Sequence, residues 1–333
     1  MLLTVAIPTY NRGKSLRATL LNFISQAERH SLTDIEILVF DNCSLDDTSE
    51  ICARIIGDHP SISIRYAKHE TNIGFDRNVN ALFGQARGTY VWTFSDDDQP
   101  GDDALPTVVE LLRQREVRFA FVNYKVSVGG ALMQSRYGSG DNRWLNASEL
   151  LKEIQFSNSL ISACIFHRQT WFEANPEQHF DTFWIHFFVA RDILLRGTGL
   201  IIGRPMFTMI QAGLEQSRAE RNSADSDEVE FFLLAHLKFV QFATELASLG
   251  YDRGTCVLAK SLGEREDIYQ VINFKLTATK YSPNQIYRTW RCLWEYRFAS
   301  LQFWLLITPL LLAPSFLVKL IRVISRRIKS CRS

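Results

Sequence analysis

Short apolar runs alternate with amphipathic segments across the first 125 residues of the chain. The runs are rich in β-branched and aromatic residues and are bounded by Pro, Gly, Asp or Asn, which is typical of buried strands. They cover residues 2–7, 35–40, 62–66, 90–94 and 119–123. Between them, apolar residues recur at helical spacing. The alternation predicts right-handed strand–helix–strand crossovers, and therefore an α/β fold with a mostly parallel central sheet flanked by helices.

The sequence after residue 125 is less regular. Residues 127–148 are rich in Gly, Ser and Asn, which predicts a loop or hairpin. Further strands are expected at 164–166 and 200–202, with a helix over 183–195 between them. The segment 211–228 is polar and predicts a mobile loop, whereas 229–279 follows a helical pattern. We therefore expect a domain over 1–212, a helical extension over 213–285 and a separate segment over 286–333.

Composition excludes several classes of protein. With 46% hydrophobic residues in 333, the chain can bury a core and is not wholly disordered. A net charge of +1 argues against a nucleic-acid partner. The six cysteines form no C-x-x-C pair, which is typical of a reducing compartment. The opening apolar run is too short for a signal peptide, so we expect a cytosolic body.

Polar residues gather where the expected strands end. In a largely parallel sheet these ends meet at one edge, where α/β proteins bind ligands. Residues near these ends form four groups along the chain: Pro8, Thr9, Asn11 and Arg12; Asp41, Asn42 and Ser44; Asn72, Gly74 and Arg77; and Ser95, Asp96, Asp97 and Asp98. Each alone also fits a helix cap or a turn. Their convergence on one edge is what predicts a site.

Five acidic residues lie within the eight positions from Asp96 to Asp103. Adjacent carboxylates repel one another unless a cation offsets their charge. Carboxylate oxygens suit Mg²⁺ or Mn²⁺, and Mg²⁺ commonly combines one or two carboxylates with substrate phosphates. The alternative is a solvated acidic turn followed by acids at the start of a helix.

Four segments together resemble the family 2 glycosyltransferases: Val-Ala-Ile-Pro-Thr-Tyr-Asn-Arg at 5–12, Val-Phe-Asp-Asn-Cys-Ser-Leu-Asp-Asp-Thr at 39–48, Asn-Ile-Gly-Phe-Asp-Arg-Asn at 72–78 and Phe-Ser-Asp-Asp-Asp at 94–98. Within that family the chain is similar to bacterial enzymes of O-antigen and other surface-polysaccharide assembly, the abequosyltransferase type among them. The resemblance covers about residues 3–210. It implies a GT-A fold and an inverting transfer of a sugar from a nucleoside-diphosphate donor.

The resemblance also implies roles for the strand-end residues. Pro8, Thr9 and Arg12 would line the nucleotide pocket, with Asn11, Asn42, Ser44, Asn72 and Gly74 in the same donor-binding set. Asp41 would accept a hydrogen bond from the base, and Arg77 would approach the diphosphate. Ser95 stands where the family often has the first acid of its Asp-x-Asp motif. Asp97 would then bind the metal, with Asp96 as a second ligand and Asp98 positioning donor or acceptor.

An inverting transfer needs a base for the acceptor hydroxyl. The family usually supplies it from a Glu-Asp pair, and none occurs between residues 150 and 215. His186 is the first candidate because its intrinsic pKa is near neutrality, and Asp181 is the second. Alternatively His186 is a hydrogen-bonded core residue, since apolar residues surround it in sequence. Asp192 is expected in a surface ion pair with Arg191 or Arg196.

Residues 298–318 carry no charge over 21 positions, and six basic residues follow within 319–333. Two prolines interrupt the apolar run, and a single crossing would put the basic residues outside, against the positive-inside tendency. We therefore expect a peripheral or monotopic element over 298–333 on an anionic membrane, at the cytoplasmic face of the bacterial inner membrane. The alternatives are a buried helical hairpin and an oligomer contact.

These inferences predict an inverting, metal-dependent glycosyltransferase that extends a lipid-linked oligosaccharide. A sugar-phosphate nucleotidyltransferase shares the layout but needs a Gly-rich loop after the first strand, where Pro-Thr-Tyr-Asn stands instead. The alternative outside enzymes is a catalytically silent sugar-nucleotide-binding or membrane-scaffold protein. An intact acidic triplet favours the enzyme, and the missing Glu-Asp pair favours the silent protein.

Overall fold

The computed structural model describes residues 1–128, 130–132, 135, 137–138, 140–211, 228–263, 287, 290–291, 294, 301 and 303–314. The chain divides into two compact units, Met1–Asn222 and Ser223–Ser333. Each is described below by itself.

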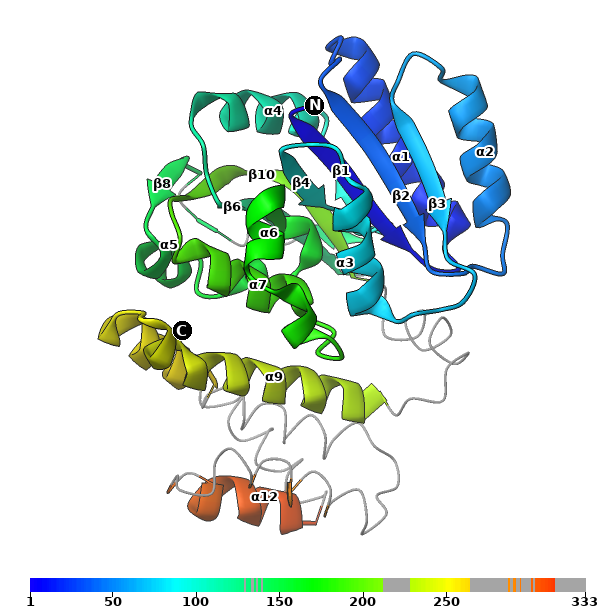
Figure 1. Cartoon of the computed structure of the whole chain (residues 1–333). Coiled ribbons are helices and arrows are strands. Elements are labelled where there is room, and N and C mark those ends of the chain that lie inside the picture. Colours follow the sequence, from blue (N-terminus) through cyan, green and yellow to red (C-terminus); the bar gives the residue numbers. More distant parts are fainter. Residues whose placement is uncertain are drawn as a thin grey trace. The chain divides into compact units, whose positions relative to one another are not determined.

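The first unit is built on one ten-stranded sheet (Figure 1). Its order is β3-β2-β1-β4-β9-β6-β10-β5, with β7 beside β6 and β8 beside β10. The strands are β1 Leu3–Thr9, β2 Ile35–Asp41, β3 Ile64–Lys68, β4 Tyr90–Thr93, β5 Gln99–Pro100, β6 Phe119–Val128, β7 Ala131–Leu132, β8 Arg143–Leu145, β9 Cys164–His167 and β10 Gly199–Gln211. Pairing is parallel from β3 through β2 and β1 to β4, and again between β6 and β10. Strand β9 joins these halves and is antiparallel to both β4 and β6.

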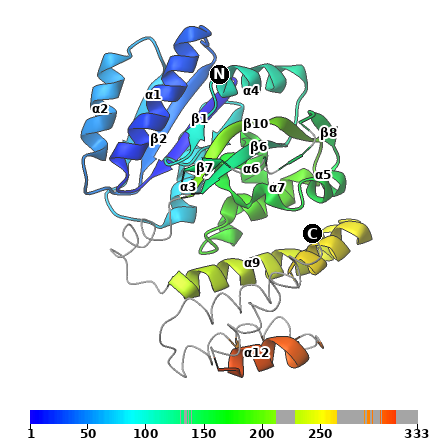
Figure 2. The same ribbon diagram turned by 180° about the vertical axis from the view of Figure 1, so that it is seen from behind.

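Helices cover both faces of this sheet, as Figures 1 and 2 show from opposite sides. They are α1 Gly13–Arg29, α2 Thr48–Asp58, α3 Phe75–Gln85, α4 Ala104–Gln114, α5 Ala147–Glu153, α6 Arg168–Glu173 and α7 Ile185–Leu194, with short 3₁₀ turns η1 Ser157–Ser159, η2 Ile161–Ala163 and η3 Pro176–His179. Helices α1, α2 and α4 lie on one face, and α3, α6 and α7 on the other. The apolar stripe of α1 is buried, with Phe23 packed edge-on against Trp92 and Phe94 of the sheet.

The predicted fold class is confirmed: an α/β unit whose parallel strands are flanked by helices. Strand order reverses at β1, because the chain runs outward from β1 through β2 to β3 and then returns to β4 on the other side of β1. Such a reversal opens a crevice at the carboxyl ends of the two strands. The loop or hairpin predicted over 127–148 is a hairpin at its start, where β7 pairs antiparallel with β6.

The described part of the second unit is helical. Helix α9 spans Glu228–Leu249, a further helix covers 253–263, and a π-helical turn η4, Phe303–Ile307, runs into α12, Thr308–Leu312. The helical pattern predicted over 229–279 is thus confirmed as far as residue 263. The loop predicted over 211–228, the rest of that helical pattern and the basic residues of 319–333 fall outside the described residues, apart from the ends at 211 and 228. Where the structure describes the chain, none of its helices has the length and apolarity needed to cross a membrane.

Candidate active site

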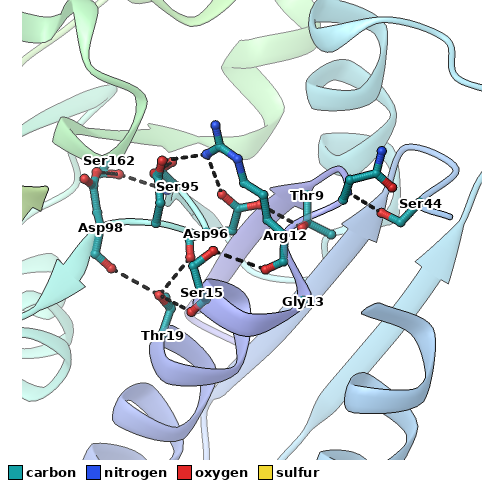
Figure 3. Close-up of polar contacts among 12 residues, drawn as sticks. Thr9, Arg12, Gly13, Ser15, Thr19, Ser44, Ser95, Asp96, Asp98 and Ser162 are labelled. Atoms are coloured by element: carbon teal, nitrogen blue, oxygen red, sulfur yellow. Dashed lines mark hydrogen bonds and ion pairs between the residues drawn. The ribbon is translucent and has the colours of Figure 1, made fainter. Parts of the chain in front are cut away.

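The turn after β1 and the turn after β4 meet at the point of strand reversal (Figure 3). The two strands are paired in register, and Phe94 N–H donates to the carbonyl of Ala6 at 2.9 Å. The Thr9 hydroxyl donates to Asp96 Oδ2 at 2.7 Å. Arg12 Nη1 lies 3.1 Å from Asp96 Oδ1 and 2.6 Å from Asp97 Oδ2. The predicted nucleotide-pocket and acidic residues are therefore in direct contact.

Two hydroxyl groups hold the acidic turn from opposite sides. The Thr19 hydroxyl on α1 lies 3.2 Å from the carbonyl oxygen of Asp96 and 3.1 Å from that of Asp98. Ser162, at η2, donates its hydroxyl to Asp98 Oδ2 and accepts the N–H of Ser95 at 2.9 Å. The turn is thus fixed to α1 on one side and to the start of β9 on the other.

Burial separates the three aspartates of this turn. Asp96 and Asp98 are each 3% exposed, and this burial raises the pKa of Asp96 to about 6 and that of Asp98 to about 7. The side chain of Asp97 is 41% exposed. Asp97 is therefore the carboxylate of the triplet that can reach a ligand from solvent.

The end of β2 carries a second polar network. Asp41 is fully buried, and its carboxylate accepts bonds from the N–H and hydroxyl of Ser44 and, at 2.6 Å, from the hydroxyl of Tyr66. Burial and the bond to Asp41 raise the pKa of Tyr66, which keeps it a neutral donor. Ser44 also accepts the N–H of Asn11 at 2.8 Å. This network ties the β2 turn to the β1 turn.

The segment before α3 joins the same edge. Asn42 donates to Asn72 Oδ1 at 2.8 Å and accepts the N–H of Ile73 at 2.9 Å. Gly74, with φ of 84°, takes a left-handed backbone conformation that favours glycine. Pro8 is buried within β1 opposite Phe40. The predicted donor-binding residues of the first three turns thus form one connected set.

Arg77, in the first turn of α3, pairs with Asp181 in two bonds of 2.5 and 3.1 Å. Its guanidinium also lies 4.8 Å from the centre of the Phe180 ring. Both partners are accessible, with side-chain exposures of 43% and 75%. The hydrogen bonds to Asp181 raise the pKa of the Arg77 guanidinium. The pair joins a predicted phosphate-binding residue to a candidate base.

His186 lies in the core. This position corrects the prediction that ranked it above Asp181 as the candidate catalytic base. It is 3% exposed, its Nε2 donates to the carbonyl of Ser159 at 2.8 Å, and burial lowers its pKa to about 4. A base must reach the acceptor hydroxyl and hold its proton. These contacts instead match the alternative interpretation, a hydrogen-bonded core histidine.

Asp192 pairs with Arg191 at 2.8 Å, as expected, but not at the surface. The Arg191 and Asp192 side chains are 3% and 12% exposed, and His179 Nε2 lies 2.7 Å from the other carboxylate oxygen. The predicted surface location was wrong, because this side of α7 packs toward the core. The cluster is part of the core.

Sequence reasoning missed Thr19, Ser162 and Asp76. Thr19 had a detectable signal, since it lies on the apolar stripe of α1 between Leu16 and Phe23, where a polar residue needs a partner. Asp76 also had a signal, since it lies within the family-like segment 72–78. Ser162 had none, because its partner Asp98 is far away in sequence.

A divalent metal at this edge would need carboxylate oxygens that are free to reach it. Within the described ranges, no group of three or more His, Cys, Asp and Glu side chains could hold a metal ion. Asp96 is engaged by Thr9 and Arg12, and Asp98 by Ser162. Asp97 accepts bonds from Ser95 and Arg12, but its side chain is 41% exposed. It is therefore the carboxylate of this turn that fits a site of the kind that Mg²⁺ or Mn²⁺ forms with one carboxylate and substrate phosphates.

The glycosyl transferase family 2 profile matches residues 4–196. The abequosyltransferase RfbV of Salmonella typhimurium is 40% identical over 105 residues, which are 32% of this chain and 31% of that protein. The GalNAc(5)-diNAcBac-PP-undecaprenol β-1,3-glucosyltransferase of Campylobacter jejuni is 28% identical over 138 residues, 41% of this chain and 43% of that protein. The chain thus matches less than half the length of either relative.

Solved structures share the fold. TarS 1–349 of S. aureus in complex with UDP has a TM-score of 0.67 at 16% identity, covering 93% of this chain and 86% of that one. The mannosyltransferase PcManGT of Pyrobaculum calidifontis, in complex with GDP-Man and Mn²⁺, has a TM-score of 0.53 at 16% identity, covering 93% and 84%. Because the profile covers more than half of the chain and the fold agrees with these enzymes, this protein belongs to glycosyl transferase family 2 and has its GT-A fold.

Proposed function

We propose that the protein transfers a sugar, with inversion at the anomeric carbon, from a nucleoside-diphosphate sugar to a hydroxyl of a polyprenyl-diphosphate-linked oligosaccharide. The reaction would serve O-antigen or related cell-surface polysaccharide assembly. The relatives support this class of substrate, since one is named as an abequosyltransferase and another as acting on an undecaprenol-linked glycan. Because the matches cover only part of these relatives, we name neither the transferred sugar nor the nucleotide base.

The observation that carries the proposal is the contact between the β1 and β4 turns. Thr9 and Arg12 meet Asp96 and Asp97 where the strand order reverses, the place at which α/β sheets bind ligands. The related TarS and PcManGT structures contain UDP and GDP-Man. A nucleoside diphosphate bound at this edge would therefore lie against a cationic residue and an acidic turn.

Asp97 would hold the Mn²⁺ or Mg²⁺ ion, together with oxygens of the donor diphosphate. When bound, such an ion stabilises the negative charge that develops on the departing diphosphate. Thr19 and Ser162 hold the turn in place. Binding of the ion would therefore require only the Asp97 side chain to exchange its Arg12 and Ser95 partners for the ion. Arg77 would add a second positive charge near the diphosphate.

Asp181 would take the proton from the acceptor hydroxyl. Its carboxylate is accessible, and φ of 62° puts its backbone in the left-handed region, which non-glycine residues occupy mainly where surrounding contacts impose it. We prefer it to His186 because that side chain is enclosed in the core. Arg77 holds the Asp181 carboxylate through two hydrogen bonds.

The second unit would bring the enzyme to its lipid-linked acceptor at the cytoplasmic face of the inner membrane. Large apolar side chains are exposed on η4, on α12 and at residue 301; these are Leu301, Trp304, Leu305, Leu306 and Leu312. The sequence that follows carries six basic residues in 319–333. Apolar contact combined with cationic charge is the pattern of elements that lie on anionic lipid surfaces.

Asp97→Asn tests the proposed reaction. The substitution removes one charged oxygen from an accessible side chain, so the fold should be kept while kcat for sugar transfer falls by about 10²–10³-fold. The assay uses a panel of nucleoside-diphosphate sugars with Mn²⁺ and, separately, with a chelator. Asp103→Asn, which removes an exposed carboxylate of the same acidic run, is the matched control and should keep kcat within about twofold.

Undiminished transfer by Asp97→Asn would overturn the site assignment. Failure of the unmodified chain to transfer or hydrolyse any donor would support the other candidate, a catalytically silent sugar-nucleotide-binding or scaffold protein. Equal turnover with metal and with chelator would remove the metal from the proposal.

A further inference from the structure

Asp76 lies next to Arg77 in the first turn of α3. Its buried carboxylate accepts hydrogen bonds from the backbone of the segment that leads into α7. It is 4% exposed. Its Oδ2 accepts the N–H groups of Thr182 at 2.7 Å and Phe183 at 2.8 Å, and its Oδ1 accepts the N–H of Ile185 at 3.2 Å. All three donors belong to the segment that follows Asp181.

These bonds make Asp76 a cap for a helix other than its own. Ile185 is the first residue of α7, and its N–H is one of the groups at a helix start that lack a partner within the helix. Trp184, at the N-cap position of α7, makes no side-chain capping bond. A negative charge placed there from α3 satisfies these donors and interacts favourably with the helix dipole.

The capped segment has an unfavourable backbone. Asp181 and Phe183 have φ of 62° and 61°, the left-handed region in which side chains other than glycine are strained. Such conformations cost about 1–3 kcal/mol each and persist only where neighbouring contacts impose them. The three bonds to Asp76 lie at and around these residues, so they are among the contacts that hold the segment in this shape.

Residues 76 and 77 therefore act on one segment in two ways. Asp76 fixes its backbone, and Arg77 binds the carboxylate of Asp181. From the other side, His186 Nε2 donates to Ser159 and anchors the first turn of α7 to η1. The start of α7 is thus anchored to α3 and η1 together, and Asp181 itself is bound by Arg77 of α3.

We infer that Asp76 is a positioning residue for Asp181: by capping α7 it places the Asp181 carboxylate for proton transfer from the acceptor. The inference rests on the proposed role of Asp181 as base. It assigns to Asp76 no contact with donor, acceptor or metal. Loss of Asp76 should therefore reduce the chemical step and leave donor binding nearly unchanged.

A double-mutant cycle on the full chain tests this. Asp76→Asn keeps an acceptor for two of the three N–H groups and brings an amide donor against the third. We expect kcat to fall about 10–100-fold, the effect of misplacing a catalytic group, with KM for the donor changed less than about twofold. Asp181→Asn should lower kcat at least as much. The double variant should be no slower than Asp181→Asn alone, because without the base its position no longer matters.

Glu36→Gln is the matched control. Glu36 is also a fully buried carboxylate, bonded to the Thr4 hydroxyl at 2.7 Å and to Arg87 N–H at 2.6 Å. It lies near the start of β2, beside the start of β1, whereas the candidate site lies where these strands end. Both substitutions should lower the thermal unfolding midpoint, while Glu36→Gln leaves kcat unchanged. Asp76→Ser, with a single acceptor and room for water, replaces Asp76→Asn if that variant does not fold.

Normal kcat in a folded Asp76 variant would overturn the inference, since its role would then be structural only. Losses that multiply in the double variant would also overturn it, because Asp76 would act independently of Asp181. Normal kcat in Asp181→Asn would instead show that the proposed base is wrong, and this inference would fall with it. The single variants thus separate the two failures.

Discussion

Asp96, Asp97 and Asp98 are neighbours in sequence but have different surroundings. Asp96 is bonded to Thr9 and Arg12, and Asp98 to Ser162, so both build the turn. With its pKa raised to about 7 by burial, Asp98 is only partly charged at neutral pH, which reduces repulsion within the turn. Asp97 is the exposed carboxylate of the three, and its charge is offset by Arg12 at 2.6 Å. This division is what allows three adjacent acids in a folded protein.

At the same scale, His186→Gln separates a core histidine from a base. Burial lowers the pKa of His186 from 6.5 to about 4, so the unfolded chain binds a proton first as pH falls. The stability that comes from keeping His186 neutral is complete above pH 6.5 and is lost as pH falls through about 4. By pH 4.5 this loss amounts to about 2 kcal/mol. Gln can still donate to Ser159 and does not titrate.

We therefore expect the free energy of unfolding, measured with denaturant at pH 7 and pH 4.5, to fall less in His186→Gln than in the unmodified chain. Its kcat should stay within about threefold, as for a substitution away from the reacting atoms. The same pH dependence in both proteins, or loss of turnover in the variant, would contradict the core assignment.

Residue roles could be predicted where the signal is local and not where it depends on tertiary contact. The polar residues at strand ends identified the edge, because strand polarity and sheet topology bring them together. Their partners could not be found this way: Thr9 and Asp96 are 87 positions apart. His186 was ranked above Asp181 because sequence gives its intrinsic pKa, whereas burial in the fold decides its actual one.

At the scale of elements, the seven longer strands were predicted, whereas the short strands β5, β7 and β8 and the full lengths of β6 and β10 were not. Strands β6 and β10 both run beyond the expected 119–123 and 200–202, because their parallel pairing continues past an irregularity between Ile202 and Phe207.

Asn123 bridges this region. It is fully buried, and its side chain donates to the carbonyl oxygens of Tyr137 and Gly203. Its role is to hold two strands and a hairpin together.

The exposed apolar side chains of η4 and α12 give a prediction at this scale. Leu305→Ser with Leu306→Ser removes two of them, with side chains 69% and 48% exposed in the structure. If this element lies on lipid, the affinity for anionic vesicles measured by sedimentation should fall by about 100-fold or more, because each of the two buried apolar side chains contributes about 1.5–3 kcal/mol.

Val257→Ser is the control for that experiment, since Val257 is an equally exposed apolar residue on the helix over 253–263. It should leave vesicle binding unchanged. Equal sedimentation of all three proteins, or no binding by the unmodified chain, would contradict membrane association through η4 and α12.

At the scale of the whole molecule, the alternation of strands and helices was enough to predict the first unit. Right-handed crossovers allow few arrangements for such a pattern, and the order β3-β2-β1-β4 is one of them. The near-zero net charge combines about −5 over residues 1–318 with +6 over 319–333. That separation is consistent with one part that binds a nucleotide sugar and another that meets anionic lipid.

The central claim, that a nucleoside diphosphate binds where the β1 and β4 turns meet, is tested most directly by calorimetric titration. The full chain is titrated with UDP, GDP, CDP and dTDP, each in Mn²⁺ and in chelator. We expect at least one of these nucleotides to bind, and to bind about tenfold or more tightly with Mn²⁺, a difference of about 1.4 kcal/mol. Absence of binding by all four in both conditions would contradict it.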